Sequence, residues 1–401
     1  MTKQELIETE KQVLLNTYTR PPFVISHGKG MYLYDTDGNR YLDFMAGIAV
    51  NAVGYGDEGL LKVLNEQARK LWHCSNLFYN EPQVRLAKLL VDNTFADKVF
   101  FSNSGSESIE GAIKFARKLG HADASAPRTE IISFRNSFHG RTMGALSATG
   151  QEKFQQGFEP LLPGFVFAEF NDLDSVARLV NANTCAILVE PVQGEGGIFP
   201  AEKGFMQGLA ALAAKNGCLI ILDEIQCGLG RTGRFCAHEH YGMAPDIMAL
   251  AKPIAGGLPL GAILVNDRVA AHIQAGNHGS TFGGGPLVTA VAEYVVSRIL
   301  AKGFLDHVRE TGAHLLSRLA QLQQSYPVLS AIRGTGLMVG VEFTIEIKKI
   351  MQTCQQNGLL LCKSGDKILR FLPPLIAEKS HIDEALHIFE NALQAETDHG
   401  N

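Results

Sequence analysis

Two charged residues follow short apolar runs of the sequence, and their types suit the chemistry of one bound group. Lys252 follows the apolar run 247–251, and Asp223 follows the run 218–222. A lysine at the end of a buried strand is disfavoured as a cation and loses its proton readily, which suits it to Schiff-base formation. A buried carboxylate such as Asp223 requires a cationic partner, and a protonated pyridine nitrogen would be one.

A third candidate is the turn NSGSE at 103–107, which lies between an expected strand and an expected helix. Such a turn offers free backbone N–H groups, small side chains and the positive end of a helix, so phosphate is its natural ligand. Each candidate also has an ordinary structural explanation. Ser104 or Ser106 can cap a helix, Asp223 can do the same, and Lys252 can be a surface lysine. Their order along the chain favours a shared site.

The elements that must position these residues are short apolar strands alternating with helices between about residues 85 and 285. The expected strands are 98–102, 130–134, 185–190, 218–223 and 247–251. Runs that are apolar throughout are typical of strands covered on both faces, as in a mostly parallel sheet. Ligands of such sheets bind at the carboxyl ends of the strands, where the three candidates stand. The sequence therefore predicts an α/β fold.

The two ends of the chain have a different pattern. The first 60 residues are expected to form strands and turns, and the region after residue 290 is expected to form a smaller α+β unit. Long amphipathic stretches there carry leucines at helical spacing, among them Leu305, Leu315 and Leu322. We therefore expect an N-terminal segment at 1–62 that joins the small domain, a large domain at 63–290, and a C-terminal small domain at 291–401.

Composition excludes several classes of function. The net charge is −5, which leaves no electrostatic footprint for nucleic acid or an anionic membrane. No apolar run approaches the roughly 18 residues of a spanning helix, and the polar, acidic N-terminus resembles neither a secretory signal nor a transit peptide. The seven cysteines form no C-x-x-C pair, which favours a reducing, cytoplasmic location. We expect neither nucleic acid nor membrane as a partner.

Two weaker motifs are set aside. His238 and His240 could share a strand face and bind a metal, but no third ligand is indicated and a solvated loop is favoured, so no metal site is expected. The glycine-rich segment 228–233 resembles a dinucleotide loop only loosely, because no acidic residue stands at the Rossmann spacing.

Taken together, the motifs resemble those of the class III, ornithine-type aminotransferases over nearly the whole chain, and most closely the branch that acts on N2-acetylornithine. The motifs that carry the resemblance stand in family order: FSNSGSE at 101–107, SFHGRT at 137–142, EPVQGEG at 190–196, LDEIQ at 222–226, GLGRTG at 228–233, Lys252, GSTF at 279–282, RGTG at 333–336 and LRF at 369–371. The resemblance implies the type I fold of transferases that depend on pyridoxal phosphate (PLP). That fold has a large domain with a mixed, mostly parallel sheet and a small α+β domain built from both chain ends.

The resemblance also implies which residues surround the cofactor. The cofactor-binding set is Gly105, Ser106, Phe138, Asp223, Glu224, Ile225, Gln226, Lys252 and Thr281. In the family, Lys252 would bind the cofactor covalently and then move the proton, while Asp223 would pair with the pyridine nitrogen. Phe138 would stack on the ring, and Gln226 would lie near its hydroxyl group. Thr281 would reach the phosphate from the partner subunit, so a homodimer is expected.

A second set would bind the substrates. Arg141 would take a substrate carboxylate, Ser280 would lie near the substrate, and Glu195 and Arg370 would form a gate pair. Ile48 stands where ornithine aminotransferases carry a tyrosine that helps to bind free ornithine. The resemblance therefore implies transfer of an amino group from N2-acetylornithine to 2-oxoglutarate, which yields the 5-semialdehyde and glutamate, in arginine biosynthesis.

Other activities stay open at this point. Succinylornithine, N-succinyl-diaminopimelate and 4-aminobutyrate are alternative donors, because selectivity among them depends on pocket shape. A PLP aminomutase of the same fold, which needs no external acceptor, and a non-catalytic scaffold are further alternatives. The sequence departs from the family pattern at Ile109, Pro253 and Gly285, and the segment YGDE at 55–58 replaces a turn that contains histidine.

Overall fold

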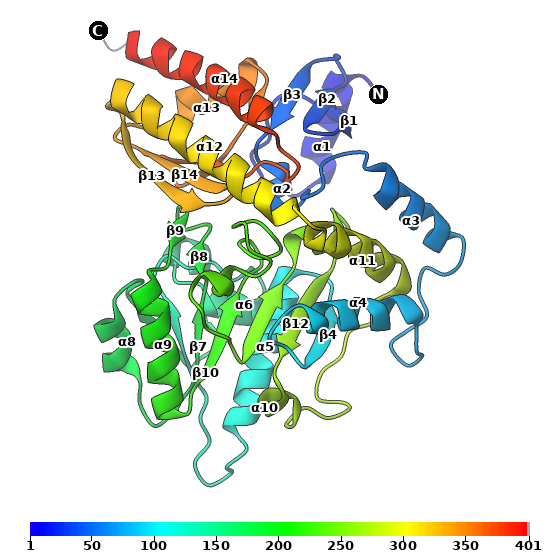
Figure 1. Ribbon diagram of the computed structural model, residues 1–401, viewed down its shortest axis with the longest axis vertical. Helices are drawn as coiled ribbons and strands as arrows, with labels where there is room; N and C mark the ends of the chain where they lie inside the picture. The colour runs from blue at the N-terminus through cyan, green and yellow to red at the C-terminus, as the bar shows by residue number, and fades with distance from the viewer. Residues whose placement is uncertain (399–401) are drawn as a thin grey trace.

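The computed structural model describes residues 1–398, and these form two stacked regions (Figure 1). The larger region is built on a sheet with the strand order β4 (Lys98–Ser102), β12 (Gly261–Val265), β11 (Ile247–Leu250), β10 (Leu219–Asp223), β7 (Thr184–Val189), β5 (Glu130–Phe134) and β6 (Phe165–Ala168). Neighbouring strands are parallel except at β12, which is antiparallel to both β11 and β4. The sheet is therefore mixed and mostly parallel, as predicted.

Helices bury both faces of this sheet. Successive side chains of a strand point to opposite faces, so each face forms its own apolar cluster with the helices that cover it. Ile221 of β10 belongs to the apolar cluster that includes Ile113 of α5 (Gly105–Gly120). Its neighbour Ile220 belongs to the cluster that includes Leu209 of α9 (Lys203–Asn216). Every residue of β7, β10 and β12 is buried, which explains why these strands are apolar apart from Thr184 at the start of β7 and Asp223 at the end of β10.

Helix α5 begins where the sequence predicts it. The side chain of Ser104 accepts a hydrogen bond from the backbone N–H of Glu107 at 3.2 Å and so caps the first turn. The buried stripe of this helix includes Ile109, Ala112 and Ile113, which packs α5 against the sheet. Packing and cap together hold the helix N-terminus at the carboxyl end of β4.

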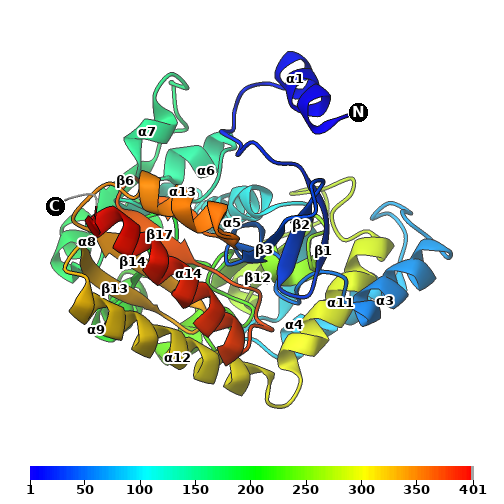
Figure 2. The same ribbon diagram turned by 90° about the horizontal axis from the view of Figure 1, so that it is seen from above.

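The smaller region contains both ends of the chain (Figures 1 and 2). Its antiparallel sheet has the order β13 (Leu329–Thr335), β14 (Met338–Phe343), β17 (Ile368–Phe371) and β16 (Cys362–Ser364). A second sheet joins the N-terminal strands β1 (Ile25–Lys29), β2 (Tyr32–Asp35) and β3 (Arg40–Asp43) to β15 (Leu359–Leu360), which runs parallel to β3. The helices of this region are α12 (Phe304–Ser325), α13 (Lys348–Gln356) and α14 (Lys379–Asp398).

The remaining elements are shorter or link the two regions. They are α1 (Lys3–Val13), α2 (Ala46–Ala49), α3 (Glu58–Ala68), α4 (Glu81–Asp92), α6 (Met143–Ala148), α7 (Glu152–Gln155), α8 (Leu173–Leu179), α10 (Asp267–Ala270), α11 (Pro286–Leu300), β8 (Val192–Gln193), β9 (Phe199–Pro200), and the 3-10 helices η1 (Ala237–His240) and η2 (Lys252–Ala255). Within residues 1–398, no helix combines the length and the apolar composition that crossing a bilayer requires.

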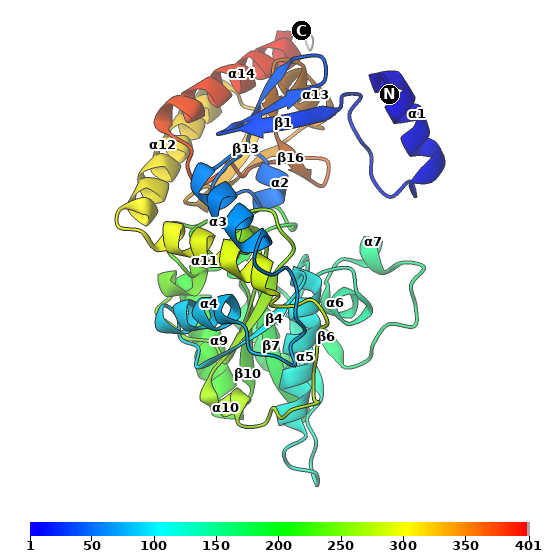
Figure 3. The ribbon, with the colours of Figure 1, turned by 90° about the vertical axis from the view of Figure 1, so that its right-hand side faces the viewer.

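One helix was not predicted, and the two expected domain boundaries lie inside helices. The first 60 residues include α1, a helix that was not predicted and that stands apart from the rest of the chain in Figure 3. None of its residues is buried, so it lacks the buried apolar stripe by which a helix is recognised in a sequence. A capping box formed by Thr2 and Glu5 begins it. The expected domain boundaries at 62/63 and 290/291 fall inside α3 and α11, and the division into domains remains a prediction.

Candidate active site

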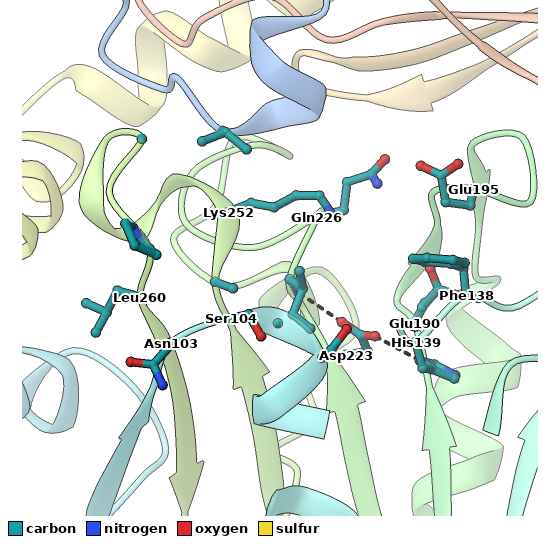
Figure 4. Close-up of a pocket in the computed structure, with 18 of the residues that line it drawn as sticks. Asn103, Ser104, Phe138, His139, Glu190, Glu195, Asp223, Gln226, Lys252 and Leu260 are labelled. Atoms are coloured by element: carbon teal, nitrogen blue, oxygen red, sulfur yellow. Dashed lines mark hydrogen bonds and ion pairs between the residues drawn. The ribbon is translucent and has the colours of Figure 1, made fainter. Parts of the chain in front are cut away.

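The carboxyl ends of the central strands meet at a cavity of about 360 Å³ (Figure 4). Its walls come from segments far apart in the chain. The residues that line it are Val50, Asn103, Ser104, Gly105, Ser106, Phe138, His139, Gly140, Glu190, Val192, Glu195, Asp223, Ile225, Gln226, Ala251, Lys252, Gly257, Leu258, Pro259 and Leu260. Most of the side chains that were predicted from the sequence to hold a cofactor therefore lie around one space.

Lys252 is the first residue of η2, two residues after the end of β11, and its side chain extends into the cavity (Figure 4). The residue is partly buried, and its exposed part faces the cavity that it lines. Desolvation lowers the pKa of the amine, although the negative charges of Asp223 and Glu195 oppose this shift. Its φ of +25° is rare for a residue with a side chain, and such strain is concentrated at functional sites. A lysine with a lowered pKa is a better nucleophile and base than an exposed one.

Asp223, at the end of β10, is held by a residue that sequence reasoning did not select. One carboxylate oxygen accepts the N–H of Ile225 at 3.0 Å, and the other lies 2.8 Å from Nδ1 of His139. Both side chains are buried. Within residues 1–398, Nε2 of His139 has no hydrogen-bond partner. Because the carboxylate can only accept, Nδ1 of His139 carries the proton of this bond.

Glu190 is a second residue of the cavity wall that the sequence did not single out. Its carboxyl group accepts the backbone N–H groups of Phe138 at 3.1 Å and Gly194 at 3.2 Å. Burial, together with the nearby charge of Asp223, raises the pKa of Glu190 well above its ordinary value. Only its place in the motif at 190–196 pointed to this residue. Glu190 links the segment that carries Phe138 to the segment that carries Glu195.

Glu195 and Arg370 form an ion pair at one side of the cavity. The two guanidinium nitrogens lie 2.5 and 3.3 Å from the two carboxylate oxygens of Glu195, so the contact is bidentate. Arg370 is almost fully buried, whereas Glu195 keeps 24% of its side chain exposed. Although burial alone would raise it, the positive charge of Arg370 brings the pKa of Glu195 below its ordinary value. We call this contact the gate pair.

Phe138 and Ser106 line the cavity, but Arg141 lies beside it rather than in its wall. The Arg141 guanidinium is exposed and lies 4.3 Å from the ring centroid of Phe154 and 5.6 Å from that of Phe138. Its backbone N–H donates to Oγ of Ser106 at 3.2 Å. This exposed cation is free to meet an anionic group that approaches the site from solvent.

Ser280 and Thr281 are not brought to the cavity within one chain. Oγ of Ser280 accepts a hydrogen bond from Asn103 at 3.1 Å, so Ser280 lies one side chain away. Thr281 is exposed and lines a separate surface hollow of about 810 Å³. The predicted contact of Thr281 with a cofactor phosphate therefore requires a second subunit.

The carboxylate of Glu224 also points away from the cavity. It accepts the backbone N–H groups of Ala237 and His238 and lies 2.8 Å from Nδ1 of His238. Among residues 1–398, Glu224, Cys236 and His238 are the one group whose types and spacing resemble metal ligands. Because the Glu224 oxygens already accept these bonds, the group acts as a cap for η1. His238 and His240 lie on this 3-10 helix and not on a strand.

Comparisons with known proteins agree with this geometry. The family description "aminotransferase class-III" matches residues 14–393. A mitochondrial acetylornithine aminotransferase of Alnus glutinosa is 46% identical, over 99% of this chain and 89% of its own length. An acetylornithine aminotransferase of Caldanaerobacter subterraneus is 45% identical, over 97% of this chain and 99% of its own. An ornithine aminotransferase structure from Toxoplasma gondii, described with partial occupancy of PLP at its active site, superposes with a TM-score of 0.96 at 30% identity and covers 100% of this chain and 96% of that one.

Proposed function

Because the chain belongs to the class-III aminotransferases, we propose that it moves the distal amino group of N2-acetylornithine to 2-oxoglutarate with PLP as cofactor. The two relatives that are 45–46% identical to this chain are named acetylornithine aminotransferase, whereas the ornithine aminotransferase structure is 30% identical. The products are the 5-semialdehyde of N-acetylglutamate and glutamate. The activity belongs to arginine biosynthesis.

The residues around the cavity fit PLP in their chemistry. The capped N-terminus of α5, with Gly105 and Ser106, offers N–H groups and a positive helix end to a phosphate. Asp223 offers a buried carboxylate to a pyridine nitrogen, and Lys252 offers an amine of lowered pKa to an aldehyde. Phe138 offers an aromatic face on the same cavity. Anion site, carboxylate, amine and ring thus surround one space of about 360 Å³.

When bound, PLP supplies an electron sink that stabilises negative charge on the substrate carbon. Lys252 would hold the cofactor through its side-chain amine, and the same amine would serve as the base that takes the proton from the substrate carbon. Asp223 would pair with the protonated pyridine nitrogen and so favour its positive charge. His139 donates to Asp223 and so keeps this carboxylate oriented.

Two unlike substrates must use this cavity in turn. Acetylornithine reacts at its distal amine and places no carboxylate beside the reacting carbon, whereas glutamate does. The gate pair neutralises Arg370 while the acylated donor is bound, and opening of the pair frees Arg370 for the α-carboxylate of glutamate. Arg141 takes the more distant carboxylate through its planar fork. A contact that disfavours the wrong binding mode thus complements one that favours the right mode.

The observation that carries the proposal is the convergence of Lys252, Asp223 and the gate pair on one cavity. The experiment that tests it is a panel of half-reactions, read from the absorbance of the enzyme-bound cofactor. The panel contains N2-acetylornithine, N2-succinylornithine, free ornithine, N-succinyl-diaminopimelate and 4-aminobutyrate. We expect N2-acetylornithine to give the largest second-order rate constant for its half-reaction. A larger value with another donor would make that compound the preferred donor, and the proposed transamination would stand.

Addition of 2-oxoglutarate supplies the control for reaction type. An aminotransferase converts the donor in quantity only when the acceptor is present. Sustained conversion of the donor without any acceptor would favour an aminomutase. A preparation that takes up no PLP would contradict the proposal as a whole.

We also propose that the active protein is a homodimer. Large apolar side chains are exposed near Thr281, with 66% exposure at Trp72, 89% at Leu77 and 66% at Phe282. Hydrogen bonds of 2.9 Å from Asn76 to the carbonyls of Ser280 and Gly283 hold the two segments together. Exposed large apolar side chains gathered in one region are typical of a protein interface. Sedimentation at assay concentration tests this, and an active monomer would contradict it.

The proposed location is the cytoplasm. The cysteines are free thiols, most of them buried, and free thiols are typical of proteins in a reducing compartment. Fractionation of the source cells with a marker for each compartment would test this location.

A further inference from the structure

The segment between β3 and the cavity contains a run of residues in an unusual backbone conformation. Ala46, Gly47, Ile48 and Ala49 have φ angles of 48°, 64°, 65° and 63°. Residues with side chains rarely adopt this left-handed region, and a β-branched residue such as Ile48 is a clear outlier there. Such a run persists only where the surrounding structure holds it, and strain of this kind gathers at functional sites.

This left-handed turn, residues 46–49, leads directly into the wall of the active site. Val50, which follows it directly, lines the cavity that Lys252 lines. Ile48 packs on an apolar cluster that includes Val192, another residue of the cavity wall. In Figure 4 the turn is the blue ribbon that crosses above the labelled side chains. The conformation of the turn therefore sets the position of apolar side chains at the site.

A buried carboxylate holds the turn from behind. One oxygen of Asp43 accepts the backbone N–H groups of Met45 at 2.9 Å and Ala46 at 3.0 Å. The other accepts the hydroxyl of Tyr55 at 2.5 Å. Nδ2 of Asn51 donates to the same hydroxyl at 3.1 Å. Asp43 has no exposed surface, so loss of the Tyr55 bond would leave a buried acceptor unsatisfied.

Tyr55 itself is held by contacts of both its backbone and its ring. Its backbone pairs with Gly30 through two hydrogen bonds of 2.8 and 2.9 Å. Its ring occupies the space beside Gly28, where a Cβ atom would lie 2.5 Å from Cγ of Tyr55. Asn51, which donates to Tyr55, also approaches Gly257 in the wall beyond Lys252, since a Cβ there would lie 3.2 Å from its Oδ1. The hydroxyl of Tyr55 is therefore a fixed point behind the turn.

We propose that Tyr55 and Asp43 are positioning residues for donor recognition. They hold the left-handed turn so that Val50, together with Val192 on whose cluster Ile48 packs, presents an apolar wall to the acylated end of the donor. An apolar wall accepts an uncharged amide and disfavours the free α-ammonium group of an unacylated donor, whose desolvation nothing there repays. Neither residue touches a reacting atom. The inference rests on the proposed aminotransferase function and extends it to the source of donor selectivity.

The test compares Tyr55→Phe with Tyr294→Phe. Both replacements remove a hydroxyl that donates to an aspartate, because the hydroxyl of Tyr294 donates to Asp57 at 2.7 Å, outside the cavity. Both half-reactions are measured by cofactor absorbance, and each gives an apparent KM and a limiting rate. In Tyr55→Phe we expect the apparent KM for the acylated donor to rise about tenfold, the effect of one hydrogen bond to a charged group. The limiting rate and the glutamate half-reaction should change much less.

Tyr294→Phe should leave both half-reactions unchanged. Selectivity for the acylated donor over free ornithine should fall in Tyr55→Phe and not in Tyr294→Phe. If Tyr55→Phe does not fold, Asp43→Asn serves instead, because it keeps the side-chain shape and an acceptor for Tyr55 while it weakens the hold on the turn. Equal losses in both half-reactions, or the same loss in Tyr294→Phe, would reduce Tyr55 to a structural residue and overturn the proposal.

The donor preference of the unaltered enzyme tests the proposed substrate separately from the role of Tyr55. If another acylated donor reacts best, the same comparison is made with that donor, and the role of Tyr55 stands or falls on it alone. If the best donor is unacylated, the apolar wall selects no acyl group and the inference fails, although aminotransferase activity survives.

Discussion

His139 and Asp223 form a buried pair in which Nδ1 of the imidazole lies 2.8 Å from a carboxylate oxygen. Asp223→Asn should therefore slow chemistry far more than it weakens substrate binding, because the pyridine nitrogen would lose its charged partner. We expect kcat to fall about 10²–10³-fold, the size of one lost charge-stabilising contact in a buried site. Steady-state kinetics that resolve kcat and KM provide the measurement.

His139→Asn is the matched test of the histidine. It removes the donor to Asp223 but keeps the carboxylate, so the expected loss of kcat is smaller, about tenfold. A normal kcat in Asp223→Asn would rule out the assigned role of the carboxylate. A larger loss in His139→Asn than in Asp223→Asn would show that the histidine acts on its own account.

Lys252→Ala should abolish turnover while the protein still folds and binds PLP without a covalent bond. The expected loss is at least about 10⁴-fold, the upper range for a single acid–base group, since the variant also loses covalent attachment. Borohydride reduction of the unaltered enzyme, followed by peptide mapping, locates the attached lysine. Attachment at any other lysine would contradict the assignment.

Glu195→Ala should shift the balance between the two substrates. With its partner removed, Arg370 is free at all times, which favours glutamate and also admits the α-amine end of the donor. We expect the glutamate half-reaction to gain on the acetylornithine half-reaction by roughly one to two orders of magnitude, the effect of a charge contact of about 1.5–3 kcal/mol. Stopped-flow traces of both half-reactions give the ratio. Equal changes in the two would leave only a static ion pair.

Subunits that carry different defects should complement each other if Thr281 serves the neighbouring site. Lys252→Ala and Thr281→Ala each impair the homodimer, the second by weaker phosphate binding. In a mixed dimer, the subunit with intact Lys252 receives intact Thr281 from its partner, so one site is complete. Co-expression with two affinity tags isolates the mixed dimer. We expect its activity to exceed that of both parents, and no gain over the Thr281→Ala homodimer would place Thr281 outside the partner's site.

The sequence by itself determined the elements whose burial is uniform. Strands β10 and β11, which are buried at every position, lie within one residue of where their runs predicted them, and α5 follows the expected turn. A strand covered on both faces must be apolar at every position, so its pattern is local and readable. Lys252 and Asp223 were found for the same reason, because a charge at the end of such a run stands out. The motifs carried the remaining site residues through family resemblance.

Only the tertiary structure decided which residues meet. His139 and Asp223 are 84 residues apart, and no local pattern announces a contact of that range. The insertion of β12 as the single antiparallel strand between β11 and β4 is likewise a matter of pairing, to which an apolar run is indifferent. The left-handed conformation of residues 46–49 runs against the preference of the residues themselves, and it occurs where the buried Asp43, bound by the hydroxyl of Tyr55, accepts the N–H groups of Met45 and Ala46. Local propensity reports what a segment favours alone, and these features exist because distant groups outweigh that preference.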